Sequence, residues 1–187
     1  MPKRVGIFGG AFDPIHLGHL TLAETALKQA NLDLVIFIPC KIPVHKAATH
    51  AASIERVTMC RLAIADQPAF SLHTCEVNRE SPSYMINTLR ILQGEHPDAK
   101  WFLIVGQDAA ATLPTWHEAE ALLSQVTVLV GGRENSAEIS SDYVSLDMPV
   151  VNVSSTEVRE ALKTGASVEP VLPEVVKSHI DEHKLYQ

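Results

Sequence analysis

The sequence predicts an α/β fold, in which helices cover both faces of a doubly wound parallel sheet. Short apolar runs alternate along the chain with segments whose apolar residues recur at helical spacing. Three of the apolar runs end in glycine-containing turns, at Gly9, Gly106 and Gly131. Turns that follow parallel strands lie along the carboxyl edge of such a sheet, where ligands bind. We therefore expect the three turns to border one site.

The first part of the chain supplies two strands and two helices. Val5–Phe8 is an unbroken apolar run typical of a buried strand, and residues 17–30 repeat apolar side chains at helical spacing. Leu34–Ile38 predicts the second strand, which a proline stops. Residues 39–52 hold prolines and small or polar residues, which indicates a loop. Helical spacing resumes at Ile54.

The middle of the chain continues the alternation. Phe70–Val77 predicts a weaker strand, because its apolar and polar residues alternate imperfectly. A turn at residues 79–83 leads into a helix with apolar residues between Ile86 and Leu92. Trp101–Val105 is an unbroken apolar run and predicts a central strand. Val126–Val130 predicts the strand after it.

The last quarter of the chain reads as mostly helical. Residues 134–149 are acidic and predict an irregular segment, and Val150–Val153 predicts a short edge strand. Ser154 and Glu157 have the spacing of a capping box, which marks the start of a helix. A glycine closes that helix, and a final helix is expected over about residues 171–184.

Length and composition favour one globular domain over residues 1–187, with a C-terminal helical portion, about residues 154–187, packed on it. With 15 Lys and Arg against 22 Asp and Glu, the formal net charge is −7, which argues against a general nucleic-acid binder. A polyphosphate ligand would have to be neutralised by a few local groups. Either a monomer or a homo-oligomer fits this composition.

The cysteines and the apolar runs indicate a cytoplasmic protein without a membrane partner. Cys40, Cys60 and Cys75 are odd in number and lack C-x-x-C spacing, which disfavours a disulfide framework or a structural zinc site. The N-terminal residues lack the apolar segment of a signal peptide. None of the apolar runs approaches the ~18 residues that a membrane span requires.

The stretch from Gly9 to His19 has the layout of a phosphate site. It joins the first strand to the first helix, where backbone amides and the positive end of a helix dipole face a ligand. Its glycines allow a large charged group to approach the backbone. His16 and His19 share one face of the first helical turn. Taken alone, such a pair is more often solvated than functional, and two ligands are too few for zinc.

Two common nucleotide signatures are missing from this turn. It has neither the G-x-x-x-x-G-K-[S/T] sequence of a P-loop nor the G-x-G-x-x-G fingerprint of dinucleotide binding. P-loop phosphoryl transfer and dinucleotide redox chemistry are therefore both disfavoured.

The complete stretch, Gly-Gly-Ala-Phe-Asp-Pro-Ile-His-Leu-Gly-His, resembles the G-G-x-F-D-P-x-H-x-G-H signature of the nucleotidylyltransferase superfamily, whose fold is Rossmann-like. Ala11 stands where relatives commonly have Thr or Ser. Val153–Arg159 is similar to the second signature of that superfamily, I-S-S-T-x-x-R. Further segments resemble the bacterial nicotinate-nucleotide adenylyltransferases, namely Ile38-Pro39, Pro43–Lys46, Arg79–Tyr84, Ile104–Asp108, Leu113–Trp116 and His183–Tyr186.

The resemblance implies transfer of the adenylyl group of ATP to nicotinate mononucleotide, which yields deamido-NAD and pyrophosphate. It also implies Mg²⁺ carried with ATP and held mainly by phosphate oxygens and water. Met85, His117 and Cys40 depart from the residues that relatives often carry, so the choice between the acid and the amide of the pyridine stays open. The alternatives are the same transfer to nicotinamide mononucleotide or another phosphate acceptor, such as a phosphopantetheine, and a non-catalytic nucleotide sensor.

The resemblance also assigns roles to residues. His16 and His19 are the catalytic candidates, through contacts to the ATP phosphates. The implied ATP-binding residues are Gly9, Gly10, Ala11, Phe12, Gly18, Gly106, Asp108, Arg133, Ser154, Ser155, Thr156 and Arg159. The implied pyridine-nucleotide residues are His45, Lys46, Ser83, Tyr84, Met85 and Trp116.

Several of these residues also have a purely structural interpretation. Arg159 would be a solvated helix residue, Asp108 would cap the following helix, and Trp116 would belong to the core. Lys46 and Arg133 would be ordinary surface charges. Asp13 is expected to brace the loop and not to act on substrate.

Overall fold

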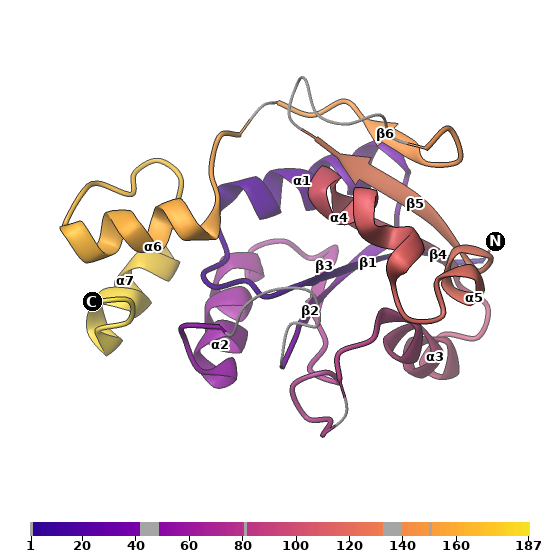
Figure 1. Ribbon diagram of the computed structural model, residues 1–187, viewed down its shortest axis with the longest axis horizontal. Coiled ribbons are helices and arrows are strands. Elements are labelled where there is room, and N and C mark those ends of the chain that lie inside the picture. The colour runs from indigo at the N-terminus through magenta and orange to yellow at the C-terminus, as the bar shows by residue number, and fades with distance from the viewer. Residues whose placement is uncertain (1, 42–48, 81, 133–139, 150) are drawn as a thin grey trace.

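The chain forms a six-stranded parallel sheet with the strand order β3-β2-β1-β4-β5-β6 (Figure 1). The computed structural model describes residues 2–41, 49–80, 82–132, 140–149 and 151–187. This order is that of a doubly wound sheet, so the predicted fold class is confirmed. The strands are β1 (Arg4–Gly10), β2 (Leu34–Pro39), β3 (Phe70–Leu72), β4 (Lys100–Gly106), β5 (Val126–Gly131) and β6 (Val144–Leu146).

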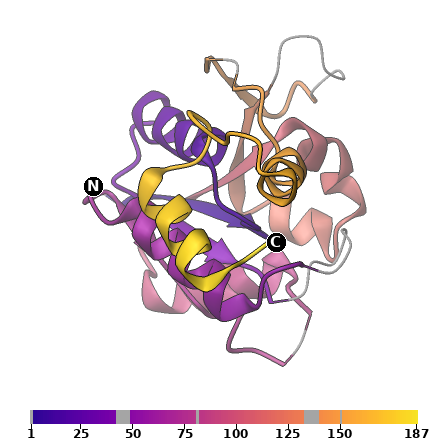
Figure 2. The same cartoon turned by 90° about the vertical axis from the view of Figure 1, so that its left-hand side faces the viewer.

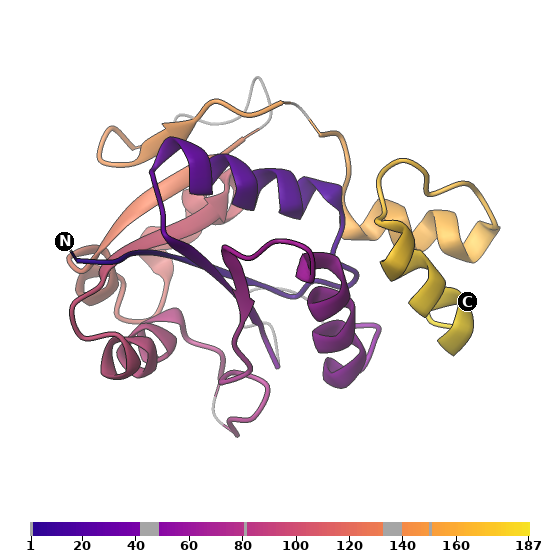
Figure 3. The same ribbon diagram turned by 180° about the vertical axis from the view of Figure 1, so that it is seen from behind.

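Helices lie on both faces of the sheet because successive strand residues point to opposite sides. Val5 and Ile7 pack with the helices of one face, whereas Phe8 packs with those of the other. The first face carries α3 (Met85–Glu95), α4 (Gln107–Thr112), the 3-10 helix η1 (Leu113–Thr115) and α5 (Ala119–Leu123). The second face carries α1 (Leu17–Gln29) and α2 (Ser53–Ile64), which lie in front of the strands in Figure 3.

The C-terminal helices α6 (Ser155–Thr164) and α7 (Glu174–His183) extend the second face. Val158 of α6 and Val176 and Ile180 of α7 are buried in the core that α1 and α2 form with the sheet. Figure 2 shows α7 beside α2, and the two helices contact each other. Among the described residues, every helix is too short or too polar to cross a membrane.

Most predicted elements are confirmed to within a few residues, but two strands are corrected. Phe70–Val77 pairs only over Phe70–Leu72, because the chain then turns away and buries the carboxyl group of Glu76 against the Thr88 hydroxyl. The edge strand is Val144–Leu146, inside the segment expected to be irregular. Of the predicted strand Val150–Val153, residues 151–153 form no strand.

A buried arginine ties the carboxyl ends of β1 and β2 to α2. Arg56 is fully buried, and its guanidinium donates to the carbonyl oxygens of Ala11 at 2.6 Å and Cys40 at 2.7 Å. It also donates to the carbonyls of Lys41 and Ala51, at 3.3 Å each. These carbonyls belong to loop segments that lack strand partners, so one side chain satisfies backbone groups that burial would otherwise leave unpaired.

Replacing Arg56 by Met should lower the free energy of unfolding by about 3 kcal/mol or more, because several buried carbonyls lose their donor. The matched control is Arg61→Met on the same helix, where the arginine is exposed and the expected change is within about 0.5 kcal/mol. Urea unfolding of both variants measures the difference. Equal stability of the two variants would contradict the role given to Arg56.

Candidate functional site

The loop between β1 and α1 brings the two predicted histidines together at the carboxyl edge of the sheet. His16 is the N-cap residue of α1, and its backbone is extended, with φ −143° and ψ 172°. His19 follows one turn later. The two imidazole rings stack with their centroids 3.7 Å apart and their planes 28° apart. The predicted shared face is therefore confirmed.

Backbone geometry selects the tautomer of His19. The backbone N–H of His16 donates to Nδ1 of His19 at 3.2 Å, so Nδ1 is an acceptor. In the neutral ring the hydrogen then sits on Nε2, which becomes a donor. The rings of Phe8 and Phe12 lie 6.0 Å and 5.1 Å from the His19 ring and fix its orientation. Phe12 itself is buried and holds a left-handed backbone conformation, with φ 48°.

Two glycines at this edge lie in close contact with neighbouring side chains. A Cβ on Gly18 would lie 3.1 Å from the His16 ring and 3.0 Å from the side chain of Val153. A Cβ on Gly9 would lie 2.6 Å from Cε of Met85. Gly18 thus leaves room for the His16 ring and for Val153, two residues before α6, and Gly9 leaves room for Met85 at the start of α3.

Asp13 braces the loop, as expected from the sequence. Its buried carboxylate accepts hydrogen bonds from the backbone N–H groups of His50 at 2.7 Å and Ala51 at 3.1 Å. The Tyr186 hydroxyl donates to the same carboxylate at 2.7 Å. Burial and this hydrogen bond raise the pKa of Tyr186, so the phenol stays a donor. Both oxygens of Asp13 are therefore engaged by the protein.

The segment Val153–Arg159, which carries the second signature, packs against the loop Gly9–His19, which carries the first. The Ser155 hydroxyl donates to the carbonyl of Pro14 at 3.0 Å, and the Arg159 guanidinium donates to the carbonyl of Asp13 at 2.8 Å. Arg159 also donates to the Thr156 hydroxyl at 3.1 Å, so it is not the solvated helix residue of the alternative interpretation. Ser154 accepts from the backbone N–H of Glu157 at 3.2 Å, as the capping spacing predicts. The amino end of α6 thus sits against the histidine loop.

The segment from Ser83 to Met85 lies beside the same edge. The Ser83 hydroxyl accepts from the backbone N–H of Lys41 at 3.3 Å, which joins it to the end of β2. The Tyr84 ring stacks on the His117 ring, with centroids 4.2 Å apart and planes 25° apart. Trp116, next to His117, is half-buried and donates from Nε1 to the Thr112 hydroxyl at 3.2 Å. The predicted pyridine-nucleotide residues that are described therefore form one group around the start of α3.

Gly106 and Asp108 line an open part of the edge. A Cβ on Gly106 would meet no atom within 4 Å. Gly106, not Asp108, is the N-cap residue of α4, so the capping interpretation of Asp108 is wrong. Asp108 is exposed, and among the described residues its carboxylate has no hydrogen-bond partner. The predicted residues His45, Lys46 and Arg133 lie outside the described residues.

Besides Arg56, two charged side chains near this edge were given no role from the sequence: Glu76, and Arg79, which was named only within the segment Arg79–Tyr84. Glu76 is buried and accepts from the Thr88 hydroxyl at 2.6 Å, and burial raises the pKa of its carboxyl group. The Arg79 guanidinium donates to the carbonyl of Pro82 at 3.1 Å, while its Nε and Nη1 atoms are buried and have no hydrogen-bond partner among the described residues. Glu76 was missed because its contact with Thr88 of α3 forms only in the folded chain.

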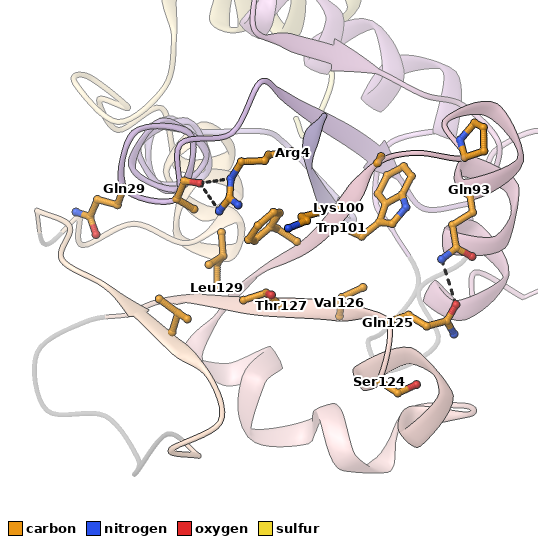
Figure 4. A pocket seen from close by; sticks show the side chains of 15 residues that line it. Arg4, Gln29, Gln93, Lys100, Trp101, Ser124, Gln125, Val126, Thr127 and Leu129 are labelled. Carbon is orange, nitrogen blue, oxygen red and sulfur yellow. Dashed lines mark hydrogen bonds between the residues drawn. The ribbon is translucent and has the colours of Figure 1, made fainter. Parts of the chain in front are cut away.

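A large hollow of about 870 Å³ lies at the opposite edge of the sheet (Figure 4). Its lining includes Arg4, Lys100 and Val126, at the amino ends of three strands. The Arg4 guanidinium donates two hydrogen bonds to the carbonyl oxygen of Ala30. The side-chain amide of Gln93 donates to the side-chain oxygen of Gln125 at 3.1 Å. This hollow is therefore separate from the histidine loop, which follows the carboxyl end of β1.

Replacing Tyr186 by Phe should lower the free energy of unfolding by about 1.5–3 kcal/mol, the range for a hydrogen bond to a charged group. Tyr143→Phe is the matched control, because the half-buried Tyr143 has no side-chain hydrogen bond to the described residues. Urea unfolding compares the two. A loss of stability no greater in Tyr186→Phe than in the control would show that Asp13 does not depend on the C-terminal tyrosine.

The sequence is similar to that of known proteins over most of its length. A cytidylyltransferase-like family model matches residues 7–161. A nicotinate-nucleotide adenylyltransferase of Bacillus subtilis is 38% identical over 188 residues, which cover 99% of each chain. A probable nicotinate-nucleotide adenylyltransferase of Listeria monocytogenes is 42% identical and covers all of this chain and 98% of its own.

Solved structures show the same fold. Plasmodium falciparum nicotinic acid mononucleotide adenylyltransferase, complexed with NaAD, superimposes with a TM-score of 0.82 at 19% identity, over 98% of this chain and 97% of its own. The identity and coverage of the bacterial relatives, together with the family match, show that the chain belongs to the nicotinate-nucleotide adenylyltransferase family of cytidylyltransferase-like proteins.

Proposed function

We propose that this chain transfers the adenylyl group of ATP to the 5′-phosphate of nicotinate mononucleotide, forming deamido-NAD and pyrophosphate in NAD biosynthesis. The observation that carries the proposal is the junction of the two signature segments. Ser155 and Arg159 donate to the carbonyls of Pro14 and Asp13, which lie two and three residues before His16 in the loop. The amino end of a helix and a histidine pair then face the same space, which suits a polyphosphate.

The reaction needs positioning and charge stabilisation more than it needs a base. A phosphate oxygen of the mononucleotide attacks the α-phosphorus of ATP, and the bond from that phosphorus to the oxygen bridging to the β-phosphate breaks. Pyrophosphate leaves with the electron pair. The attacking phosphate is ionised at neutral pH, so no proton has to be removed. Holding the reactants in line can contribute roughly 7–11 kcal/mol toward the barrier.

The histidine pair supplies donors where charge develops. With Nδ1 occupied by the His16 backbone N–H, the Nε2–H of His19 is the donor we assign to the bridging oxygen of the leaving pyrophosphate. The His16 ring, stacked on it, is assigned to the neighbouring phosphate oxygens. The hydroxyl of Thr156 and the first backbone amides of α6 are assigned to the β- and γ-phosphates.

The remaining contacts follow from the residues around α3 and α4. Gly106 leaves open space beside the exposed carboxylate of Asp108, which we assign to a ribose hydroxyl. We assign the pyridine ring to the group formed by Ser83, Tyr84 and Trp116. His45 and Lys46, from the segment Pro43–Lys46, and Arg133, a candidate cation after β5, remain proposed contacts that rest on the sequence.

We also propose that the reaction takes place in the cytoplasm and that Mg²⁺ arrives with ATP. Both oxygens of Asp13 already accept protein hydrogen bonds, which fits an ion held by phosphate oxygens and water, not by a protein cage. When bound, Mg²⁺ would neutralise charge on the departing pyrophosphate.

Replacing His19 by Ala should lower kcat by ~10²-fold or more while the KM for ATP changes little, because the donor acts on charge that grows in the transition state. Steady-state kinetics measure the two constants separately. His96→Ala is the control, since His96 lies near Trp101 at the opposite edge of the sheet. A change confined to KM in His19→Ala would contradict the transition-state role.

The acceptor is tested by comparing nicotinate and nicotinamide mononucleotides at equal concentration. We expect kcat/KM to be at least about tenfold higher for the nicotinate acceptor, as differential recognition of a carboxylate predicts. Pyrophosphate release should require the acceptor. Equal turnover of the two acceptors would contradict the substrate assignment, and ATP binding without any pyrophosphate release would indicate a nucleotide sensor.

A further inference from the structure

Glu55, His179 and His183 form a cluster on the face of the molecule where α2 and α7 meet. Glu55 lies in the first turn of α2, and the two histidines lie four residues apart on α7. One nitrogen of each ring and one carboxylate oxygen of Glu55 lie within 4.8 Å of one another. Figure 2 shows the two helices side by side at this point. This cluster is no part of the nucleotide site described above.

The hydrogen bonds of His183 leave one ring nitrogen suited to a metal. Nδ1 of His183 lies 3.0 Å from the carbonyl oxygen of His179. A carbonyl only accepts, so Nδ1 carries the hydrogen and the neutral ring keeps its lone pair on Nε2. Histidines that bind metals commonly donate their other N–H to a backbone carbonyl in this way. His183 is also exposed, so an ion can reach it.

His179 and Glu55 complete the donor set. Nε2 of His179 lies 2.7 Å from Oε2 of Glu55, and the side chain of His179 is only 10% exposed. The rings of His179 and His183 lie 4.1 Å apart, as expected for side chains at i and i+4 on one helix face. An ion could take the place of the proton between His179 and Glu55, while the imidazole keeps a proton on Nδ1.

We propose that Glu55, His179 and His183 bind a divalent transition-metal ion of the zinc class. Two imidazole nitrogens and one carboxylate oxygen, with water as the fourth ligand, make a ligand set that zinc accepts. Ligands of a tetrahedral zinc lie ~3.4 Å apart, since each sits about 2.1 Å from the ion. The ligand atoms, which lie within 4.8 Å of one another, would have to move closer by side-chain rotation to hold the ion.

The ion would hold α7 against α2. The chain continues from α7 to Tyr186, whose hydroxyl bonds to Asp13 in the histidine loop. A metal at this point would therefore stabilise the C-terminal segment that braces the nucleotide site. The site would be structural, because its three ligands come from α2 and α7 and include none of the residues assigned to the nucleotide site.

The experiment uses the full chain after treatment with a chelator. Titration with Zn²⁺ in a calorimeter should show one ion bound per chain, and Zn²⁺ should raise Tm. His183→Ala and Glu55→Gln should each weaken zinc binding by at least about tenfold and reduce the rise in Tm. Glu55→Gln keeps a hydrogen-bonding partner for His179, so it separates the loss of the metal from a loss of fold.

Matched controls distinguish this site from other zinc ligands. His73→Ala removes a histidine that also contacts a glutamate, Glu95, at 3.3 Å, and it should leave zinc binding unchanged. Burial raises the pKa of Cys40 to about 11, and it also raises the pKa of Cys60 and Cys75, so thiolates compete poorly. Failure of the wild-type chain to bind Zn²⁺, or unchanged affinity in His183→Ala, would overturn the proposal. So would loss of binding in His19→Ala alone, which would move the ion to the histidine pair.

Discussion

The buried carboxylate of Asp13 is the interaction on which the site depends. It accepts hydrogen bonds from the backbone of His50 and Ala51 and from the hydroxyl of Tyr186, so it joins the loop before α2 and the C-terminus to the histidine loop. The backbone carbonyl of Asp13 accepts a hydrogen bond from the Arg159 guanidinium of α6. Residues separated by up to 173 positions in the sequence thereby meet at one loop. A charge buried this way is stable only when it is fully hydrogen-bonded, which makes the arrangement sensitive to the loss of any partner.

This bracing explains how the chain can favour a reaction that needs little proton transfer. The hydrogen bonds of the Asp13 carboxylate and the bond from the Arg56 guanidinium to the Ala11 carbonyl fix the loop. The stacked rings of His16 and His19 are therefore held in place before any ligand binds. Donors that are already oriented lose little free energy in reorganising as charge develops, which is the main source of electrostatic catalysis. The left-handed backbone conformation of Phe12 contributes to this orientation, because it turns the chain so that the Phe12 ring packs on the His19 ring.

Local patterns in the sequence predicted most of the helices and strands, and the two signature motifs identified most of the candidate site residues. Unbroken apolar runs predicted β1, β2, β4 and β5, and the spacing of Ser154 and Glu157 predicted the start of α6. Edge strands were predicted less well, because a three-residue strand such as Val144–Leu146 has too few residues for a pattern. Arg56, Glu76 and the pairing of Glu55 with His179 could not be predicted, since each depends on contacts between distant segments. Asp108 does not cap α4, because the helix begins at Gln107, two residues earlier than a capping aspartate at position 108 would require.

A structure of the chain with a non-hydrolysable ATP analogue would show directly where the phosphates lie. We expect the triphosphate to occupy the carboxyl edge of the sheet, with a phosphate oxygen within about 3.2 Å of Nε2 of His19 and others at the amino end of α6. Binding of the triphosphate in the hollow beside Arg4 and Lys100, or at the carboxyl edge but away from both histidines, would contradict it.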